Sequence, residues 1–312
     1  LYIISNSLIL AFLSTLASFI LSSIVGILWL KDRILKDDTT QVKKTLKEWF
    51  LGSHATAVSV AFGLMPSLDA IIAYPLIGSL IVAAFFIVSS VSTLLRDSTN
   101  VGLRYLHSYV LRTGDFRTAL RNLEVSLALV IPFLAYGIMH PVYVIYIYNP
   151  IYSWASFAIS IFLITAIIEI INNGISQIAS GNIRESGIKA ASKFTKMNLL
   201  GVLPSIIYLA LVALVFFIFR EMPIQFILII WSIVYLIRYL LSVLITAHFF
   251  IPKNVNKSLL TQSVPKLLLY ISISLALSYI IKPIGQPSTR LLTDIKNLAI
   301  PGIIEAIIFY AI

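Results

Sequence analysis

The sequence contains no cysteine and little charge. Without cysteine, the chain forms no disulfide bond, no iron–sulfur cluster and no thiolate zinc site. Charged residues make up 12% of the 312 residues, about half of the share that is usual in soluble domains. Hydrophobic residues make up 59%, which is more apolar surface than one water-soluble core of this length buries. We therefore expect most of the chain to lie in lipid.

Signatures of catalysis and of metal binding are also absent from the sequence. It contains no Walker A glycine loop, no HExxH motif and no GxSxG motif. His140 and His248 lie at the ends of apolar runs and lack acidic or histidine neighbours at the spacing of metal ligands. We therefore expect a protein that is not an enzyme and that has no metal and no cofactor.

Long apolar runs organise the chain. A run of about 20 apolar residues is long enough to cross a bilayer as a helix, and a helix satisfies its own backbone hydrogen bonds in lipid. We predict an all-α, polytopic membrane helical bundle of about nine spans. The predicted spans are residues 6–30, 50–66, 72–95, 122–141, 151–172, 197–219, 223–250, 266–282 and 297–312.

Basic residues gather in alternate connections between these spans. Eighteen of the 23 Lys and Arg residues lie in segments 31–49, 96–121, 173–196 and 251–266, and only four lie in the other connections. The positive-inside rule places such basic connections in the cytoplasm, which predicts a multi-pass protein of the cell membrane. Topology and attraction to anionic membrane lipids account for the net charge of +10, so we expect no nucleic-acid partner.

Two of the basic connections are long enough to hold short helices at the membrane interface. These segments are residues 97–118 and 176–196. In the first, apolar residues recur at helical spacing with basic residues elsewhere on the helical wheel, which is typical of an amphipathic interfacial helix. The apolar residues are Leu103, Leu106, Val110 and Leu111.

One arginine stands inside a predicted span. Trp231, Tyr235, Arg238, Ser242 and Thr246 follow one another at steps of four, three, four and four, which lines up one face of a helix. A charged side chain within a span marks either a path for a substrate or a structural ion pair. We predict that Arg238, with Tyr235 and Trp231, binds an anionic substrate. The alternative is an ion pair between helices.

Two acidic residues are further candidates. Glu169 shares a polar stripe with Thr165, either Asn172 or Asn173, and Ser176. Glu169 and Asn173 are candidate substrate ligands. The alternative for Glu169 is a carboxylate that reaches water from the cytoplasmic end of its span. Asp69 lies in the uncharged connection before the third span. It is a candidate site for a coupling ion, H⁺ or Na⁺, and its alternative is a solvated loop carboxylate.

Several motifs follow one another in a definite order. Asp69 lies near the outer start of a span, Gly114 and Asp115 open the next one, and the turn 148–152, Tyr-Asn-Pro-Ile-Tyr, follows. A short basic loop with a glycine comes after the next span. In this order the chain resembles the polysaccharide flippases (Wzx-type) of the multidrug/oligosaccharidyl-lipid/polysaccharide superfamily, although Asn149 stands where that family has glycine.

The resemblance implies a two-lobe transporter that flips or exports a lipid-linked oligosaccharide or polysaccharide precursor by alternating access. Arg238 would meet the phosphate of the lipid-linked sugar. Residues 1–49 would then hold the last span of a first lobe and a basic cytoplasmic connection. Residues 50–312 would hold a second lobe that is truncated at the C-terminus, since the chain ends within an apolar run.

Other functions stay open on the sequence. A multidrug-type cation antiporter would use Asp69 as its coupling site. A membrane-embedded glycosyltransferase predicts a carboxylate cluster at one membrane face, and a passive integral-membrane subunit predicts flat apolar interfaces without a cavity. A flippase predicts a wet cleft between two helix bundles, with Arg238 lining it.

Overall fold

A computed structural model describes residues 68–185, 187–253, 255, 259–288 and 290–312, together with Leu21 and Val25. The chain divides into two compact units, residues 1–53 and 54–312. All the elements described below belong to the second unit. The predicted spans 6–30 and 50–66 and the predicted connection 31–49 lie outside the described residues, apart from the helical Leu21 and Val25.

Helices form the described part of the chain, which contains no strand. The α-helices and two short helical turns, η2 (3₁₀) and η3 (π), follow one another along the chain. They are α5 (Leu68–Ile77), α6 (Ser79–Leu103), α7 (Tyr105–Thr113), α8 (Phe116–Met139), α9 (Pro141–Tyr148), η2 (Pro150–Ala155), α10 (Ser156–Gly181), α11 (Gly187–Phe219), α12 (Ile224–Phe250), η3 (Leu259–Ser263), α14 (Val264–Ile280) and α15 (Leu291–Ala311).

Six stretches of these helices are long and apolar enough to cross a membrane, counted over the described residues. They correspond in order to the third through eighth predicted spans, so the all-α, membrane-embedded bundle is confirmed. The stretches are Ser79–Thr113, Phe116–Met139, Pro150–Gly181, Ile188–Phe219, Ile224–Phe250 and Thr261–Ile280.

The predicted number of about nine spans is not confirmed. The ninth predicted span, 297–312, belongs to α15, which begins earlier and includes Asp294, Lys296 and Glu305. Every 18-residue stretch of α15 includes all three charges, whereas each of the six candidate spans contains an apolar stretch of that length with at most two. The third predicted span also differs, because Gly78 adopts a φ of 104° and separates α5 from α6. That left-handed conformation is open to glycine at little cost.

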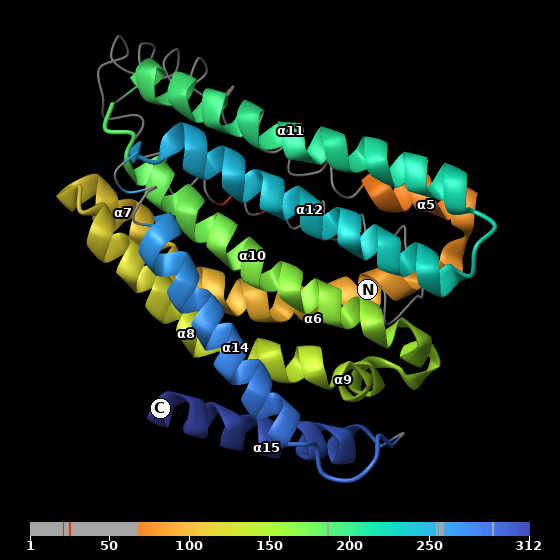
Figure 1. Ribbon diagram of the computed structural model, residues 1–312. Coiled ribbons are helices and arrows are strands. Elements are labelled where there is room, and N and C mark those ends of the chain that lie inside the picture. The colour runs from red at the N-terminus through yellow and green to blue at the C-terminus, as the bar shows by residue number, and fades with distance from the viewer. Residues whose placement is uncertain are drawn as a thin grey trace. The chain divides into compact units, whose positions relative to one another are not determined.

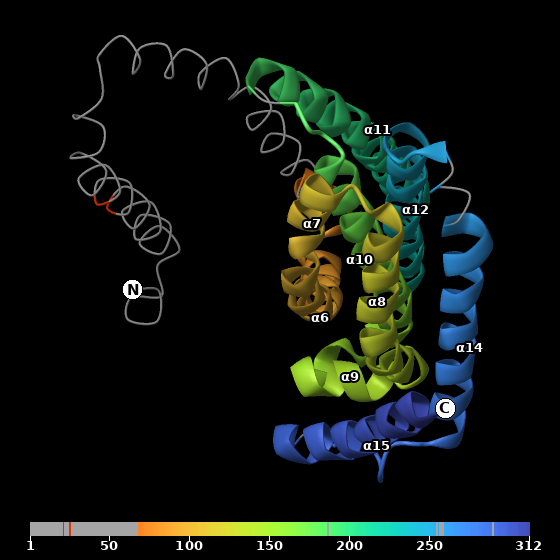
Figure 2. The same ribbon diagram turned by 90° about the vertical axis from the view of Figure 1, so that its left-hand side faces the viewer.

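Helix α10 lies at the centre of the bundle. It packs against α12 on one side and against α6 and α8 on another, and Figure 1 shows it between α12 and α6. Its side chains Ile159, Phe162, Ile170 and Ile175 have no exposed surface. Helix α15 crosses the bundle against α8 and α9, as Figure 2 shows.

The Gly-Asp motif is a helix stop followed by a helix start. Gly114 ends α7 in the left-handed conformation, with a φ of 70°. Asp115 then caps α8, because its carboxylate accepts hydrogen bonds from the backbone N–H of Thr118 at 3.1 Å and from the Thr118 hydroxyl at 2.5 Å. These hydrogen bonds hold the pKa of the Asp115 carboxyl below its ordinary value.

The two predicted interfacial helices take other forms. Helix α7 packs against α10, since His107 Nδ1 lies 2.8 Å from Ser180 Oγ and Val110 is buried. Its apolar face therefore meets protein rather than head groups, although Leu111 is exposed. Segment 176–196 is not a separate helix, because α10 continues to Gly181 and α11 begins at Gly187.

The close packing of α7 on α10 depends on Gly181. A Cβ atom at this position would lie 2.7 Å from the carbonyl oxygen of His107, and a backbone atom cannot move aside cheaply. We expect Gly181→Ala to lower the free energy of unfolding by about 1–3 kcal/mol, measured by titration of detergent micelles with dodecyl sulfate. Gly102→Ala is the matched control, since no atom lies within 4 Å of the added carbon. Equal effects of the two substitutions would contradict this packing.

Candidate functional site

Arg238 lies in the middle of α12 and is surrounded by tyrosine rings. Its Nε donates to Ser205 Oγ of α11 at 3.3 Å. Its guanidinium carbon lies 4.8 Å from the ring centroid of Tyr239, 5.5 Å from that of Tyr208 and 5.6 Å from that of Tyr235. The faces of these rings attract the cation and hold it in place without neutralising it.

One guanidinium nitrogen has no acceptor. Arg238 Nη1 is buried and donates to no atom of the described residues, and none of the ion pairs among these residues includes Arg238. The structural ion pair considered as an alternative is therefore not found in this part of the chain. Leaving a buried donor on a cation unpaired lowers stability. An anion or a water molecule that accepts a hydrogen bond from this nitrogen would offset that cost.

A polar cavity of about 400 Å³ is lined in part by Arg238, and its volume lies within the range of small-molecule sites. It lies between α10, α11 and α12, from Arg238 towards the end of α12 that precedes the basic segment 251–266. A second unpaired atom, the buried Oδ1 of Asn172, belongs to its wall. Besides Arg238, the polar lining includes Asn172, Asn173, Ser176, Ser205, Ser242 and Thr246.

Glu169 lies in the middle of α10, about one turn before the cavity-lining residues Asn172 and Asn173. Arg96 Nη1 donates to its Oε2 at 3.0 Å, and the hydroxyl of Tyr235 donates to its Oε1 at 3.3 Å. Glu169 is 1% exposed, so the alternative that it reaches water is wrong. The reason is that α10 continues to Gly181, beyond the predicted end of the span, and this places Glu169 well inside the helix.

Asp69 and Trp231 are linked to each other through Tyr208, one of the tyrosines around Arg238. The hydroxyl of Tyr208 donates to the Asp69 carboxylate and accepts from Trp231 Nε1 at 2.9 Å. Asp69 is 3% exposed within α5, so the alternative of a solvated loop carboxylate is wrong. Trp231 is fully buried and stacks on Phe85 at 3.7 Å, which places it in the core rather than in the cavity wall.

The structure thus brings the six predicted site residues into one region, but only some of them line the cavity. Arg238 and Asn173 line the cavity. Tyr235 contacts the guanidinium of Arg238 and donates a hydrogen bond to Glu169. Asp69 and Trp231 are hydrogen-bonded to Tyr208, whose ring also contacts that guanidinium. Chemically, the cavity offers a fixed cation with amide and hydroxyl groups, which suits an anion that also carries hydroxyls.

Carboxylate clusters are missing from this region. Among the residues that the structure describes, no group of three or more His, Asp or Glu side chains lies close enough to hold a metal ion. Glu169 and Asp69 already have hydrogen-bond partners from the protein.

Sequence reasoning missed several members of the network. Arg96 was assigned to a connection, because its own charge interrupts the apolar run, but α6 continues to Leu103. Tyr208 stands in a continuous apolar run and gave no signal. Tyr239 follows Arg238 directly and so lies off the stripe of polar residues that pointed to the cavity.

A further buried carboxylate lies outside this region. Glu305 of α15 has no exposed surface and accepts hydrogen bonds from the hydroxyls of Ser274 and Ser278 of α14, at 2.9 and 2.8 Å. The two serines lie four residues apart, on one face of a helix. Their spacing, with one carboxylate in the apolar run that follows, is the signal that could have identified this contact.

Comparison of the chain with protein-family models, with curated proteins and with solved structures found no match.

Proposed function

We propose that the protein is a membrane transporter that flips or exports a lipid-linked oligosaccharide or polysaccharide precursor by alternating access. Two observations on Arg238 carry this proposal: its buried Nη1 is unpaired, and the residue lines a polar cavity between helices long and apolar enough to cross a membrane. A charge inside a bilayer is expensive to maintain. A phosphate that visits the cavity would compensate it, and a guanidinium binds phosphate through two parallel hydrogen bonds.

The position of the cavity supports entry from one side. It extends from Arg238 past Ser242 and Thr246, towards the end of the bundle that carries the basic connections. In this proposal that end faces the cytoplasm of a cell with the protein in its plasma membrane, and the described helices belong to one lobe of a two-lobe transporter. The phosphate of the lipid-linked sugar reaches Arg238, while Asn173 and the serine hydroxyls contact the sugar.

The experiment that tests this proposal is a lipid-flipping assay. The purified protein is reconstituted into vesicles that contain a fluorescent polyprenyl-diphosphate sugar, and dithionite bleaches the label that faces outward. We expect bleaching to continue beyond the outer leaflet in vesicles with protein, because inner-leaflet lipid is carried outward. A labelled lipid of the same chain length that lacks the diphosphate and carries no charge should cross no faster than it does in vesicles without protein. Bleaching that stops at the outer leaflet for both lipids contradicts the proposal.

Asp69 favours a second candidate, a multidrug-type cation antiporter. A carboxylate that is 3% exposed and bound by one tyrosine hydroxyl is suited to take up H⁺ or Na⁺ as a coupling ion. The cation Arg238 in the cavity opposes a cationic substrate. The same vesicles separate the two candidates. An antiporter would move ethidium in exchange for protons, driven by a pH gradient, and would leave the diphosphate lipid in place.

A further inference from the structure

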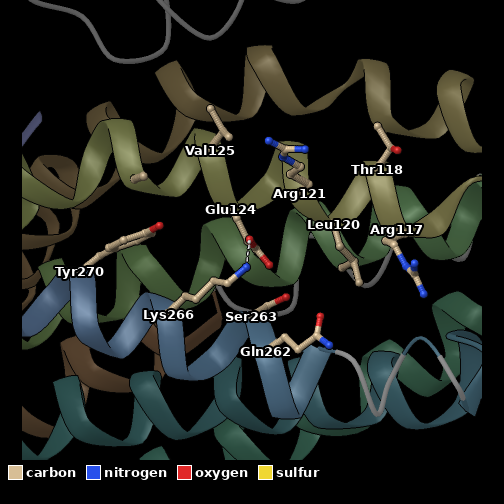
Figure 3. A pocket seen from close by; sticks show the side chains of 11 residues that line it. Arg117, Thr118, Leu120, Arg121, Glu124, Val125, Gln262, Ser263, Lys266 and Tyr270 are labelled. Atoms are coloured by element: carbon tan, nitrogen blue, oxygen red, sulfur yellow. Dashed lines mark ion pairs between the residues drawn. The ribbon is translucent and has the colours of Figure 1, made fainter.

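A second polar cavity, of about 540 Å³, lies between the start of α8 and the start of α14. Figure 3 shows Arg117 and Arg121 of α8 on one side and Lys266 of α14 on the other. Arg117 and Arg121 are four residues apart, so they share a face of α8. Lys266 lies 3.6 Å from the carboxylate of Glu124. Thr118, Ser263 and Tyr270 add hydroxyl groups to the lining.

Positive charge dominates this cavity. It has three cationic side chains and one carboxylate in its wall, and only Lys266 is paired with that carboxylate. Neither Arg117 nor Arg121 takes part in an ion pair among the described residues. Both arginines are exposed, and two such guanidinium groups beside hydroxyl groups are suited to bind an anion such as a phosphate.

An apolar cavity of about 470 Å³ continues from the basic one. The two share Leu120, Glu124 and Ser263 in their walls. From there the apolar cavity is enclosed by α8, α10, α12 and α14, and its lining is almost entirely aliphatic. The aliphatic side chains include Leu123, Leu127, Ile171, Val243, Leu244 and Leu267.

The apolar cavity is separate from the cavity of Arg238. The pair α10 and α12 turns Asn172 and Ser242 towards the Arg238 cavity, and it turns the adjacent Ile171 and Val243 towards the apolar one. A ligand of the basic and apolar cavities therefore lies on the other side of these two helices. It needs one anionic end and one hydrocarbon end.

We propose that these joined cavities bind a phospholipid with an anionic head group, whose phosphate lies on Arg117, Arg121 and Lys266 and whose hydrocarbon chain fills the apolar cavity. The positions agree with this ligand, because Arg117 and Arg121 lie in the first turns of a membrane-crossing helix, beside a basic segment. Leu123 and Leu127 lie two and six residues beyond Arg121 along the same helix. The bound lipid would link α8, α12 and α14.

The test measures lipid binding and does not depend on the proposed transport. Purified protein in dodecylmaltoside is mixed with dioleoylphosphatidylglycerol or dioleoylphosphatidylcholine, and bound lipid is counted by native mass spectrometry. We expect the anionic lipid to bind more tightly. The double variant Arg117→Gln/Arg121→Gln should lose about thirtyfold in affinity for it, since each basic group near a membrane surface contributes about a factor of five.

Arg112→Gln/Lys189→Gln is the matched control. It removes the same charge from the same end of the bundle, and neither residue lines either cavity. Equal losses in the two double variants would overturn the proposal, because general attraction would then explain binding. Ala247→Leu, which fills part of the apolar cavity, should also weaken binding, with the unfolding midpoint as its check. Complete displacement of the lipid by millimolar glycerol 3-phosphate would show a site for a free phosphate and overturn the lipid assignment.

Discussion

Replacing Arg238 by glutamine is expected to slow transfer of the diphosphate lipid by about ten- to hundredfold. The substitution removes charge-assisted hydrogen bonds to the phosphate, each worth about 1.5–3 kcal/mol, and every 1.4 kcal/mol corresponds to about a factor of ten. Folding should be retained, because no carboxylate among the described residues forms an ion pair with Arg238 and would be left unpaired. The initial bleaching rate in the vesicle assay, corrected for the amount of reconstituted protein, measures the effect.

Arg220→Gln is the control for this substitution. It removes the same charge from an exposed position between α11 and α12, where Arg220 pairs with Glu221 at 3.7 Å. We expect its transfer rate to equal that of the unchanged protein. Arg238→Lys should give an intermediate rate, since lysine retains the charge but cannot bind a phosphate through two parallel hydrogen bonds. An unchanged rate in Arg238→Gln would remove this residue from the substrate path.

Replacing Arg96 by leucine is expected to lower the free energy of unfolding by about 3 kcal/mol. The substitution leaves the carboxylate of Glu169, which is 1% exposed, without its cation. Arg96 is itself 22% exposed, so the expected effect lies at the lower end of the range for breaking a buried ion pair. Adding Glu169→Gln removes the unpaired charge. The double variant should therefore recover most of the loss, which titration with dodecyl sulfate measures.

Lys193→Leu is the control for this pair. It removes the ion pair between Lys193 and Glu185, whose side chains are 57% and 33% exposed, and exposed pairs contribute little to stability. We expect its unfolding midpoint to be unchanged. If Arg96→Leu and the double variant were equally unstable, lost packing rather than an unpaired charge would be the cause.

The membrane helices were predictable because their signal is local. A run of apolar residues identifies a span wherever it occurs, and the third to eighth predicted spans are found as helices. The stripe through Arg238, Ser242 and Thr246 was predictable for the same reason, since these residues share one face of α12 and line one cavity.

Contacts between distant helices were not predictable in this way. The pair of Arg96 and Glu169 joins residues 73 positions apart, and the bond of Tyr208 to Asp69 joins residues 139 apart. An acidic residue near the end of an apolar run is assigned to water unless its partner is known. The two alternatives that proved wrong, a solvated Asp69 and a Glu169 that reaches water, both have this cause.

Helix ends were the other source of error. The apolar runs end before the helices do, because polar residues such as Asn172, Asn173 and Ser176 continue α10 while they face a cavity within the protein. Hydropathy alone cannot distinguish a polar face that meets a protein cavity from one that meets head groups.

Water is expected to reach Arg238 through its cavity when the protein lies in a membrane, and cysteine labelling measures this access. The chain has no cysteine of its own, so single cysteines can be placed at three positions. Ser242 lies in the cavity wall and Ser232 is fully buried. Ser272 lies on the outer flank of α14, which would face lipid in the membrane. A membrane-impermeant methanethiosulfonate reagent, added to inside-out membranes, should modify Ser242→Cys much faster than Ser232→Cys or Ser272→Cys. Equal, slow labelling at all three positions would contradict this expectation.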